Sequence, residues 1–287
     1  NRELWWAHTG GGGGNFGVIT RFWFRSPGST GTDPSALLPQ PPAEVLVSAI
    51  AWPWAEMTEA RFARLVKNYG DWHAKNLKPG TPNDNLVSML ALNHKSNGYI
   101  GLITQADATV PNADGILDDF LAAMTAGLDV AHEPLSTPMG ELPAMPELAE
   151  PRRMPWLQAA RYLGTTNPTL NDPSLQGDFK SAYYRTAMPD AHISEFYRHL
   201  TRTDLVNPTA SVLLSSFGGK VNAVAPDATA APHREAAYKA AWMIWWTDPA
   251  DEPKSLAWIR EFFHGVYAGT GGVPVPNAVT DGCYVNY

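Results

Sequence analysis

The chain has 287 residues, enough for one large domain or two small ones; 44% of them are hydrophobic and 17% are charged. This balance is typical of a globular protein and excludes a disordered or collagen-like chain. The net charge of -7 argues against nucleic acid or an anionic membrane as a partner, because phosphate groups are bound mainly by Lys and Arg. No apolar run approaches the ~20 residues needed to cross a bilayer.

The single cysteine, Cys283, excludes an intrachain disulfide and leaves the compartment open between a secreted and a cytoplasmic protein. The eight histidines show neither H-x-x-x-H nor H-E-x-x-H spacing, so no metal site is predicted. The chain begins with Asn1 rather than Met and stops at Tyr287 in the middle of an expected strand. Both ends are therefore expected to be cut, and a targeting segment would lie outside the sequence.

Five consecutive glycines, residues 10–14, are the first distinctive feature of the chain. The stretch 12–17 has the spacing G-x-G-x-x-G, which dinucleotide-binding folds place in front of a helix. Residues 18–24 are instead β-branched and aromatic and predict a strand. The glycines are therefore predicted to form a tight turn, or to let the backbone pass close to a bulky cofactor, without a Rossmann helix.

Beyond this strand, residues 26–42 are rich in Pro, Ser and Gly and predict a linker. Strands and helices then alternate, with an irregular segment predicted at 134–178 that is expected to line a site. Strands are predicted at 45–54, 85–94, 98–106, 180–187, 210–224 (with a kink at Gly218 and Gly219), 236–247 and 284–287; helices are predicted at 58–75, 112–128, 190–202 and 253–268. This order favours an α+β fold, a large antiparallel sheet with helices packed on one face.

Four segments resemble a known family. Glu3 to Thr20, "ELWWAHTGGGGGNFGVIT", resembles the end of the FAD-binding domain of the berberine-bridge-enzyme-like flavin oxidases, a branch of the vanillyl-alcohol oxidase superfamily. Three later segments agree in order and spacing: "FKSAYYR" at 179–185, "SSFGGKVNAVAPDATAAPHR" at 215–234 and "GCYVNY" at 282–287. The resemblance covers essentially the whole chain and is closest to actinomycete members that oxidise alcohols on sugars or polyketide glycosides.

The resemblance implies a division of the chain into parts of a two-domain protein. Residues 1–25 would end the FAD-binding domain, 26–42 would be the linker, 43–280 the substrate-binding domain and 281–287 the start of a segment returning to the flavin. The family commonly links FAD to a His and a Cys that would lie before Asn1, so neither His8 nor Cys283 is expected to have that role. The missing FAD-domain segments are therefore expected partners.

The resemblance also implies a set of site residues. Tyr287, which closes the Y-V-N-Y motif, would be the catalytic base. Tyr183 would face the substrate, and Ser215 stands where relatives that perform two successive oxidations carry a second tyrosine. Because a serine hydroxyl is far less acidic than a phenol, a single oxidation is predicted. The residues expected to contact the flavin are Gly12, Gly13, Gly14, Asn15, Gly17, Val18 and Asn286.

Two structural alternatives remain for these residues. Gly10 and Gly11 are expected to form a turn without a ligand, and Asn286 would either bond the flavin or fix its own segment. In a regular strand, side chains alternate between faces, so Val285 would share a face with Tyr287, and Tyr284 and Asn286 would lie on the other.

The implied function is that of an FAD-dependent oxidase. It would oxidise an alcohol of a sugar, glycoside or polyketide-type natural product to a carbonyl, pass the hydride to flavin N5, and use dioxygen to form hydrogen peroxide. The partners would be this small molecule, dioxygen and FAD attached through residues outside the chain. The alternative is a non-catalytic module that binds a carbohydrate or another small ligand and lacks a functional flavin domain.

Overall fold

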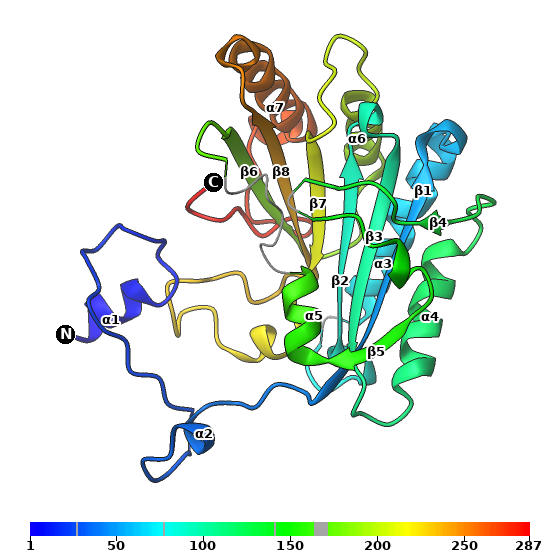
Figure 1. Cartoon of the computed structure of the whole chain (residues 1–287). Coiled ribbons are helices and arrows are strands. Elements are labelled where there is room, and N and C mark those ends of the chain that lie inside the picture. Colours follow the sequence, from blue (N-terminus) through cyan, green and yellow to red (C-terminus); the bar gives the residue numbers. More distant parts are fainter. Residues whose placement is uncertain (27, 77, 141, 164–171) are drawn as a thin grey trace.

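The computed structural model describes residues 1–26, 28–76, 78–140, 142–163 and 172–287. Its centre is an eight-stranded antiparallel sheet with the order β4-β1-β3-β2-β7-β8-β6, in which β5 also pairs with β1 (Figure 1). The strands are β1 (Glu44–Pro53), β2 (Leu86–Asn93), β3 (Tyr99–Asp107), β4 (Glu133–Pro134), β5 (Arg152–Pro155), β6 (Gln176–Tyr184), β7 (Ser211–Ser216) and β8 (Tyr238–Trp246). The helices are α1 (Arg2–His8), α2 (Pro34–Leu37), α3 (Glu59–Asn76), α4 (Ala113–Thr125), α5 (Trp156–Leu163), α6 (Asp190–Leu200) and α7 (Glu252–Val266).

Four of these helices, α3, α4, α6 and α7, cover one face of the sheet. Helix α3 begins where the Thr58 hydroxyl accepts a hydrogen bond from the backbone N–H of Arg61, as expected for an N-cap. Its apolar side chains recur at helical spacing and are buried against the sheet. The core on this face includes the fully buried rings of Trp52, Trp242 and Phe196. The α+β fold with helices packed on one face is thus confirmed.

The opposite face is covered only in part. A second, smaller core joins Val45, Val47 and Ala49 of β1 to Met139 and to Ala159 of α5. Helix α5 therefore packs on the face away from the four long helices, in front of the sheet in Figure 1. The predicted irregular segment 134–178 contains this helix, β5 and the start of β6; its residues 141 and 164–171 lie outside the described residues.

Two predicted strands are absent. Residues 18–24 form neither strand nor helix, and Val18 and Trp23 are 95% and 81% exposed. A strand needs a neighbour with which to pair its backbone, and residues 18–24 have none among the described residues. Residues 284–287 form a turn in which the Tyr287 N–H donates to the Tyr284 carbonyl at 3.3 Å. The alternation of faces expected for Tyr284 to Tyr287 is therefore wrong.

The strand predicted at 210–224 is shorter than expected. Strand β7 ends at Ser216, and Gly218 and Gly219 have φ values of +111° and +56°, which an extended strand does not adopt. A short 3-10 helix, Gly219–Ala223, follows in place of further strand.

The predicted linker, residues 26–42, contains α2 and otherwise has no helix or strand among its described residues. None of the helices in the described parts of the chain is long and apolar enough to cross a membrane. The sequence did not predict α1, which Asn1 caps by accepting from the N–H groups of Glu3 and Leu4.

Candidate active site

The end of the chain runs along the outer strand of the sheet, β6. The Tyr183 N–H donates to the Gly282 carbonyl, and the Asp281 N–H donates to the Tyr183 carbonyl, both at 2.9 Å. One step further along, the Tyr284 N–H donates to the Ser181 hydroxyl at 2.9 Å. These bonds fix residues 281–284 against β6 and carry the following turn over the face of the sheet that the long helices leave uncovered.

Tyr287 lies over that uncovered face. Its ring stacks on Phe179 of β6, with ring centroids 5.6 Å apart and an interplanar angle of 27°. The ring of Tyr284 meets it edge-on at 5.0 Å, so these two tyrosines are in contact rather than on opposite faces. The Lys239 Nζ atom of β8 lies 5.5 Å from the centroid of the Tyr287 ring. The Tyr287 phenol therefore contacts two aromatic rings and lies near the ammonium group of Lys239.

The register of the sheet joins two other predicted site residues to this group. Tyr183 of β6 pairs with Lys239 of β8, and Lys239 pairs with Ser215 of β7. The three side chains form a row across three strands on the uncovered face, because directly paired residues point to the same side. Tyr183 and Ser215, which are 32 positions apart in sequence (215 − 183), are therefore neighbours on either side of Lys239.

Tyr183 is suited to donate a hydrogen bond rather than to accept a proton. Its side chain is 7% exposed and stacks on His233, with ring centroids 4.1 Å apart. Burial, together with the nearby Tyr284 and Tyr287, raises the pKa of the Tyr183 phenol to about 12. The group therefore stays protonated at neutral pH.

Lys239 is one of the residues near the site that sequence reasoning missed. It is half-buried in β8, a strand whose sequence, YKAAWMIWW, is otherwise apolar. Burying a lysine in such a strand costs free energy unless its charge has a partner, so the single lysine in this apolar run was the sequence signal for a functional position. Its position relative to Tyr287 depends on the turn at residues 284–287, which the sequence did not reveal.

The glycine run follows α1 and turns back toward the end of the chain. Gly12, Gly14 and Gly17 have φ values of +93°, +76° and +125°, conformations that favour glycine. A Cβ atom on Gly14 or Gly17 would meet no atom of the described residues within 4 Å, whereas one on Gly12 would lie 2.5 Å from Asn286 Oδ1. The backbone is thus open to a ligand at Gly14 and Gly17 and filled by Asn286 at Gly12.

The remaining predicted contact residues have partners within the chain or face solvent. Asn286 donates to the Tyr284 hydroxyl at 3.1 Å, and Asn15 donates to the Gly11 carbonyl at 2.8 Å. A Cβ on Gly10 would lie 2.6 Å from the backbone N of Ala231, so this glycine permits a close approach of two segments of the chain. Val18 is almost fully exposed.

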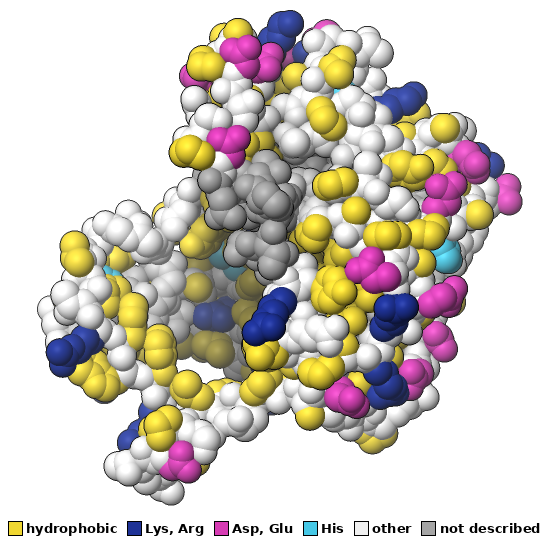
Figure 2. Space-filling model, viewed as in Figure 1, with side chains coloured by type: hydrophobic (Ala, Val, Ile, Leu, Met, Phe, Trp, Pro, Cys, Tyr) yellow, Lys and Arg dark blue, Asp and Glu magenta, His cyan; other side chains and the backbone are white. Residues whose placement is uncertain are grey.

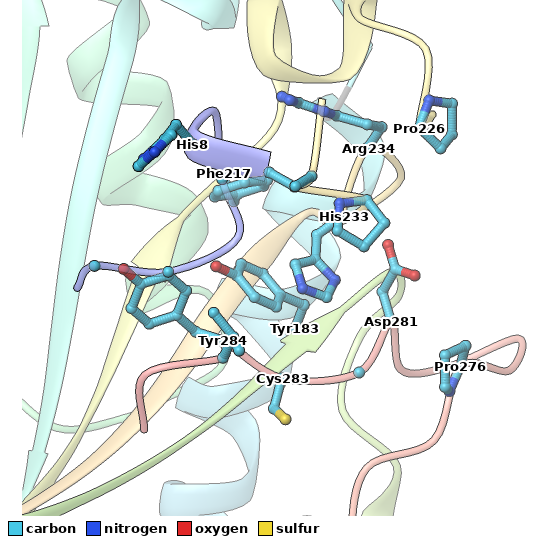
Figure 3. A pocket seen from close by; sticks show the side chains of 18 of the residues that line it. His8, Tyr183, Phe217, Pro226, His233, Arg234, Pro276, Asp281, Cys283 and Tyr284 are labelled. Atoms are coloured by element: carbon cyan, nitrogen blue, oxygen red, sulfur yellow. The ribbon is translucent and has the colours of Figure 1, made fainter. Parts of the chain in front are cut away.

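A cavity of about 1060 Å³ lies between the glycine run and the body of the domain. Figure 2 shows the hollow, with apolar side chains spread over the N-terminal segment beside it. Figure 3 shows Tyr284, Tyr183 and His233 in a row along the cavity, with Asp281 and Cys283 nearby. The predicted site residues among its lining are Gly12, Gly13, Gly14, Gly17 and Tyr183. Tyr183 therefore links the cavity to the row that includes Lys239.

This cavity fits part of a flavin. Its volume is at the upper end of the range for small-molecule sites, and the bare backbone at Gly14 and Gly17 permits the close approach of a flat, bulky group. His8 and Cys283 also line it. Within the described residues, no group of three or more His, Cys, Asp or Glu side chains could hold a metal ion.

Comparisons with known proteins agree with this geometry. No protein-family model matches the chain. It is 42% identical over 292 residues to aclacinomycin-N/aclacinomycin-A oxidase of Streptomyces galilaeus, an alignment that covers 100% of this chain and 49% of that relative. It is similar to the crystal structure of CrmK, a flavoenzyme involved in shunt product recycling in caerulomycin biosynthesis, with a TM-score of 0.90, 40% identity and coverage of 100% and 54% of the two chains.

A third similarity is to a glycopeptide hexose oxidase complexed with teicoplanin, with a TM-score of 0.84, 38% identity and coverage of 99% and 53%. The chain spans about half the length of the relatives it matches. The sequence alignment with the Streptomyces galilaeus oxidase covers the whole chain, and so does the structural match to CrmK. The chain is therefore homologous to the berberine-bridge-enzyme-like FAD-linked oxidases and spans about half the length of such a protein.

Proposed function

We propose that this chain is the substrate-facing part of an FAD-dependent oxidase in which Tyr287 takes the proton of a substrate alcohol. The observation that carries the proposal is the placement of Tyr287 on the uncovered face of the sheet, stacked on Phe179 and 5.5 Å from Lys239 Nζ. Oxidation of an alcohol to a carbonyl removes one proton from oxygen and one hydride from carbon. A tyrosine in this place supplies the base for the proton.

FAD, when held beside the open backbone of Gly14 and Gly17, would supply the acceptor for the hydride and the route for both electrons to dioxygen, which would yield hydrogen peroxide. Tyr287 contributes the base: its phenolate oxygen accepts the hydroxyl proton. The Lys239 Nζ atom, 5.5 Å from the centroid of the Tyr287 ring, places a positive charge beside the proposed base. Tyr183, which stays protonated, donates a hydrogen bond to the substrate oxygen.

The glycine run would hold the flavin from the N-terminal side. Gly14 and Gly17 offer open backbone, while Asn286 fills the space beside Gly12 and fixes the turn that carries Tyr287. The covalent attachment of FAD and most of its binding site would come from the segments that complete the protein. Asn286 would then stabilise the turn through its hydrogen bond to the Tyr284 hydroxyl, and contact with the flavin would not be its only role.

The substrate would be a hydroxyl-bearing sugar, glycoside or polyketide-type natural product. Similar proteins include an oxidase named for aclacinomycins and a hexose oxidase complexed with a glycopeptide. The rings of Phe179, Tyr284 and Tyr287 offer flat apolar surfaces to a sugar or polyketide ring. The non-catalytic module is disfavoured, because the similar proteins include oxidases and a flavoenzyme.

The test uses the full-length protein that contains this chain. We expect a yellow protein that retains its flavin after acid precipitation and releases hydrogen peroxide with at least one member of a panel of free sugars and glycosylated metabolites. A correctly folded, colourless full-length protein would contradict the oxidase and support the ligand-binding module.

We further propose that one turnover converts an alcohol to a carbonyl and stops there. Ser215 occupies the row beside Lys239, and its hydroxyl is too weakly acidic to act as a second base. Mass spectrometry of the product is expected to show the loss of two hydrogens. A doubly oxidised product formed as efficiently as the first carbonyl would contradict this proposal.

A further inference from the structure

We propose that Ser181 and the Arg185–Asp281 ion pair are positioning residues that hold the segment 277–284 against β6 and thereby set the place of the Tyr287 hydroxyl. None of these side chains was expected from the sequence to belong to the site. The inference rests on the proposed function, because it assigns them a role through the proposed base.

Arg185 ties together two points of the segment. Its Nη1 donates to the Asn277 carbonyl at 2.6 Å, and its Nη2 donates to Asp281 Oδ1 at 2.5 Å. The Asp281 side chain is only 8% exposed, so its charge is largely removed from water and depends on this partner. The Arg185 backbone N–H also donates to the Val279 carbonyl at 2.8 Å. One residue after β6 thus holds the segment by three hydrogen bonds.

Ser181 provides the last side-chain bond before the turn. Its side chain points to the uncovered face between Phe179 and Tyr183, and the residue is 1% exposed. The hydroxyl accepts the Tyr284 N–H at 2.9 Å, three residues before Tyr287. Side chains alternate along β6, so Ser181 and Phe179 lie on the same face. Ser181 fixes the backbone at Tyr284, and the Tyr287 ring three residues later stacks on Phe179.

Tyr287 lies near the surface of the described part of the chain. The residue is 44% exposed, and its backbone N–H donates a hydrogen bond of 3.3 Å within the turn. A shift of about 1 Å in a catalytic group is enough to slow a reaction ~100-fold. The bonds upstream of the turn, at Ser181 and Asp281, therefore fix the backbone from which the proposed base extends, and the contact with Phe179 orients its ring.

The experiment compares variants of the full-length flavoprotein by stopped-flow reduction of the flavin with substrate. Ser181→Ala and Asp281→Asn are expected to slow reduction at saturating substrate by 10- to 100-fold while flavin content is kept. Ser181→Thr, which retains the hydroxyl, is expected to restore most of the rate lost in Ser181→Ala. Glu235→Gln is the matched control, because Glu235 lies 3.5 Å from the same Arg185 nitrogen with a 69% exposed side chain, and it should stay within two-fold of the parent.

A double-mutant comparison separates positioning from general stability. In a Tyr287→Phe background, where there is no hydroxyl left to position, Ser181→Ala and Asp281→Asn are expected to slow reduction less than two-fold further. The same fold-loss in both backgrounds, or full activity of both single variants, would overturn the positioning role. A Tyr287→Phe variant that keeps the parent rate would instead overturn the base assignment, and this role with it.

Discussion

The two faces of the sheet are built from the same strands and differ in almost every other respect. In β8, Tyr238, Ala240 and Trp242 point into the core under the helices, while Lys239 points to the uncovered face. In β6, Tyr184 is fully buried on the helix side, and Phe179 stacks on Tyr287 on the other.

This difference places the large buried rings on one side of the sheet and the proposed site on the other. The helix side is filled by large apolar rings that contact each other edge-on, as in the cluster of Trp242 with Phe196, Phe262 and Phe263. The uncovered side gathers a lysine, a serine and several phenols where this chain does not complete the packing. Because successive side chains of a strand point to opposite faces, a residue's position in the strand determines whether it packs under the helices or lies on the uncovered face.

The largest expected effect is on chemistry alone. Tyr287→Phe removes the proposed base and is expected to slow flavin reduction by substrate ~100- to 10,000-fold, the usual contribution of a general base. Thermal stability should change little, since the ring and its stacking on Phe179 remain. Tyr197→Phe, on the helix side, is the control and should leave the rate unchanged. A rate for Tyr287→Phe within a few-fold of the parent would remove the contrast between the faces.

The converse effect is expected from the helix side. Trp242 is fully buried among four aromatic rings, so Trp242→Ala should lower the free energy of unfolding by about 3–5 kcal/mol. Urea denaturation would measure the loss, and stopped-flow reduction of the fraction that remains folded should give nearly the parent rate. A loss below ~1 kcal/mol would show that this core is not the main source of stability.

Residues on the helix side are also expected to dominate the loss of folding stability at acid pH. Burial lowers the pKa of His73 to about 3, so its neutral form is favoured in the folded state. This contribution to stability is complete above the ordinary value near 6.5 and is lost as the pH falls toward 3. Between pH 7 and pH 4.5 the loss amounts to about 3 kcal/mol.

His73→Gln tests this origin of the acid sensitivity. The variant is less stable at pH 7, because it disturbs the contact of His73 Nε2 with the Ser88 hydroxyl at 2.9 Å, but its stability should fall less on acidification. Burial also lowers the pKa of His199, to about 4, so the variant should keep part of the loss of stability on acidification, which is called the slope below. Urea titrations at both pH values measure the difference, and the exposed His132→Gln should keep the parent slope; an unchanged slope in His73→Gln would contradict the assignment.

The smallest effect concerns the glycine run. Gly14→Ala places a side chain at φ +76°, which costs about 1–2 kcal/mol of backbone strain. Gly80→Ala, at φ +85° and likewise with no described atom within 4 Å, is the matched control. Both variants should lose similar stability, but only Gly14→Ala should lower the flavin content of the purified protein. Equal flavin content in both would argue against flavin contact at Gly14.

Much of the fold was predictable because its signals are local. Apolar side chains at helical spacing marked α3, and alternating or continuous apolar runs marked β1, β2 and β8. The prediction of a strand at 18–24 failed because aromatic and β-branched residues favour a strand only when a neighbouring strand is available. The prediction at 284–287 failed because four residues are too few to outweigh a turn.

The site was predictable only in part. Family resemblance pointed to Tyr287, Tyr183 and the glycines, whose roles no local pattern could define. Lys239 and Ser181 were missed because their importance arises from register and from the path of the chain end. Such relations depend on packing between distant segments, which a periodicity analysis does not contain.

The contact of Gly12 with Asn286 joins two residues separated by nearly the entire chain. Bringing such distant segments together costs loop-closure entropy, which the intervening sheet must first repay. The turn at residues 284–287, which carries the proposed base, is therefore expected to be assembled last during folding and to come apart first under mild denaturant. Loss of the proposed oxidase activity in the full-length protein should then precede loss of helical circular dichroism, because a local opening would displace Tyr287 while most of the domain is still folded.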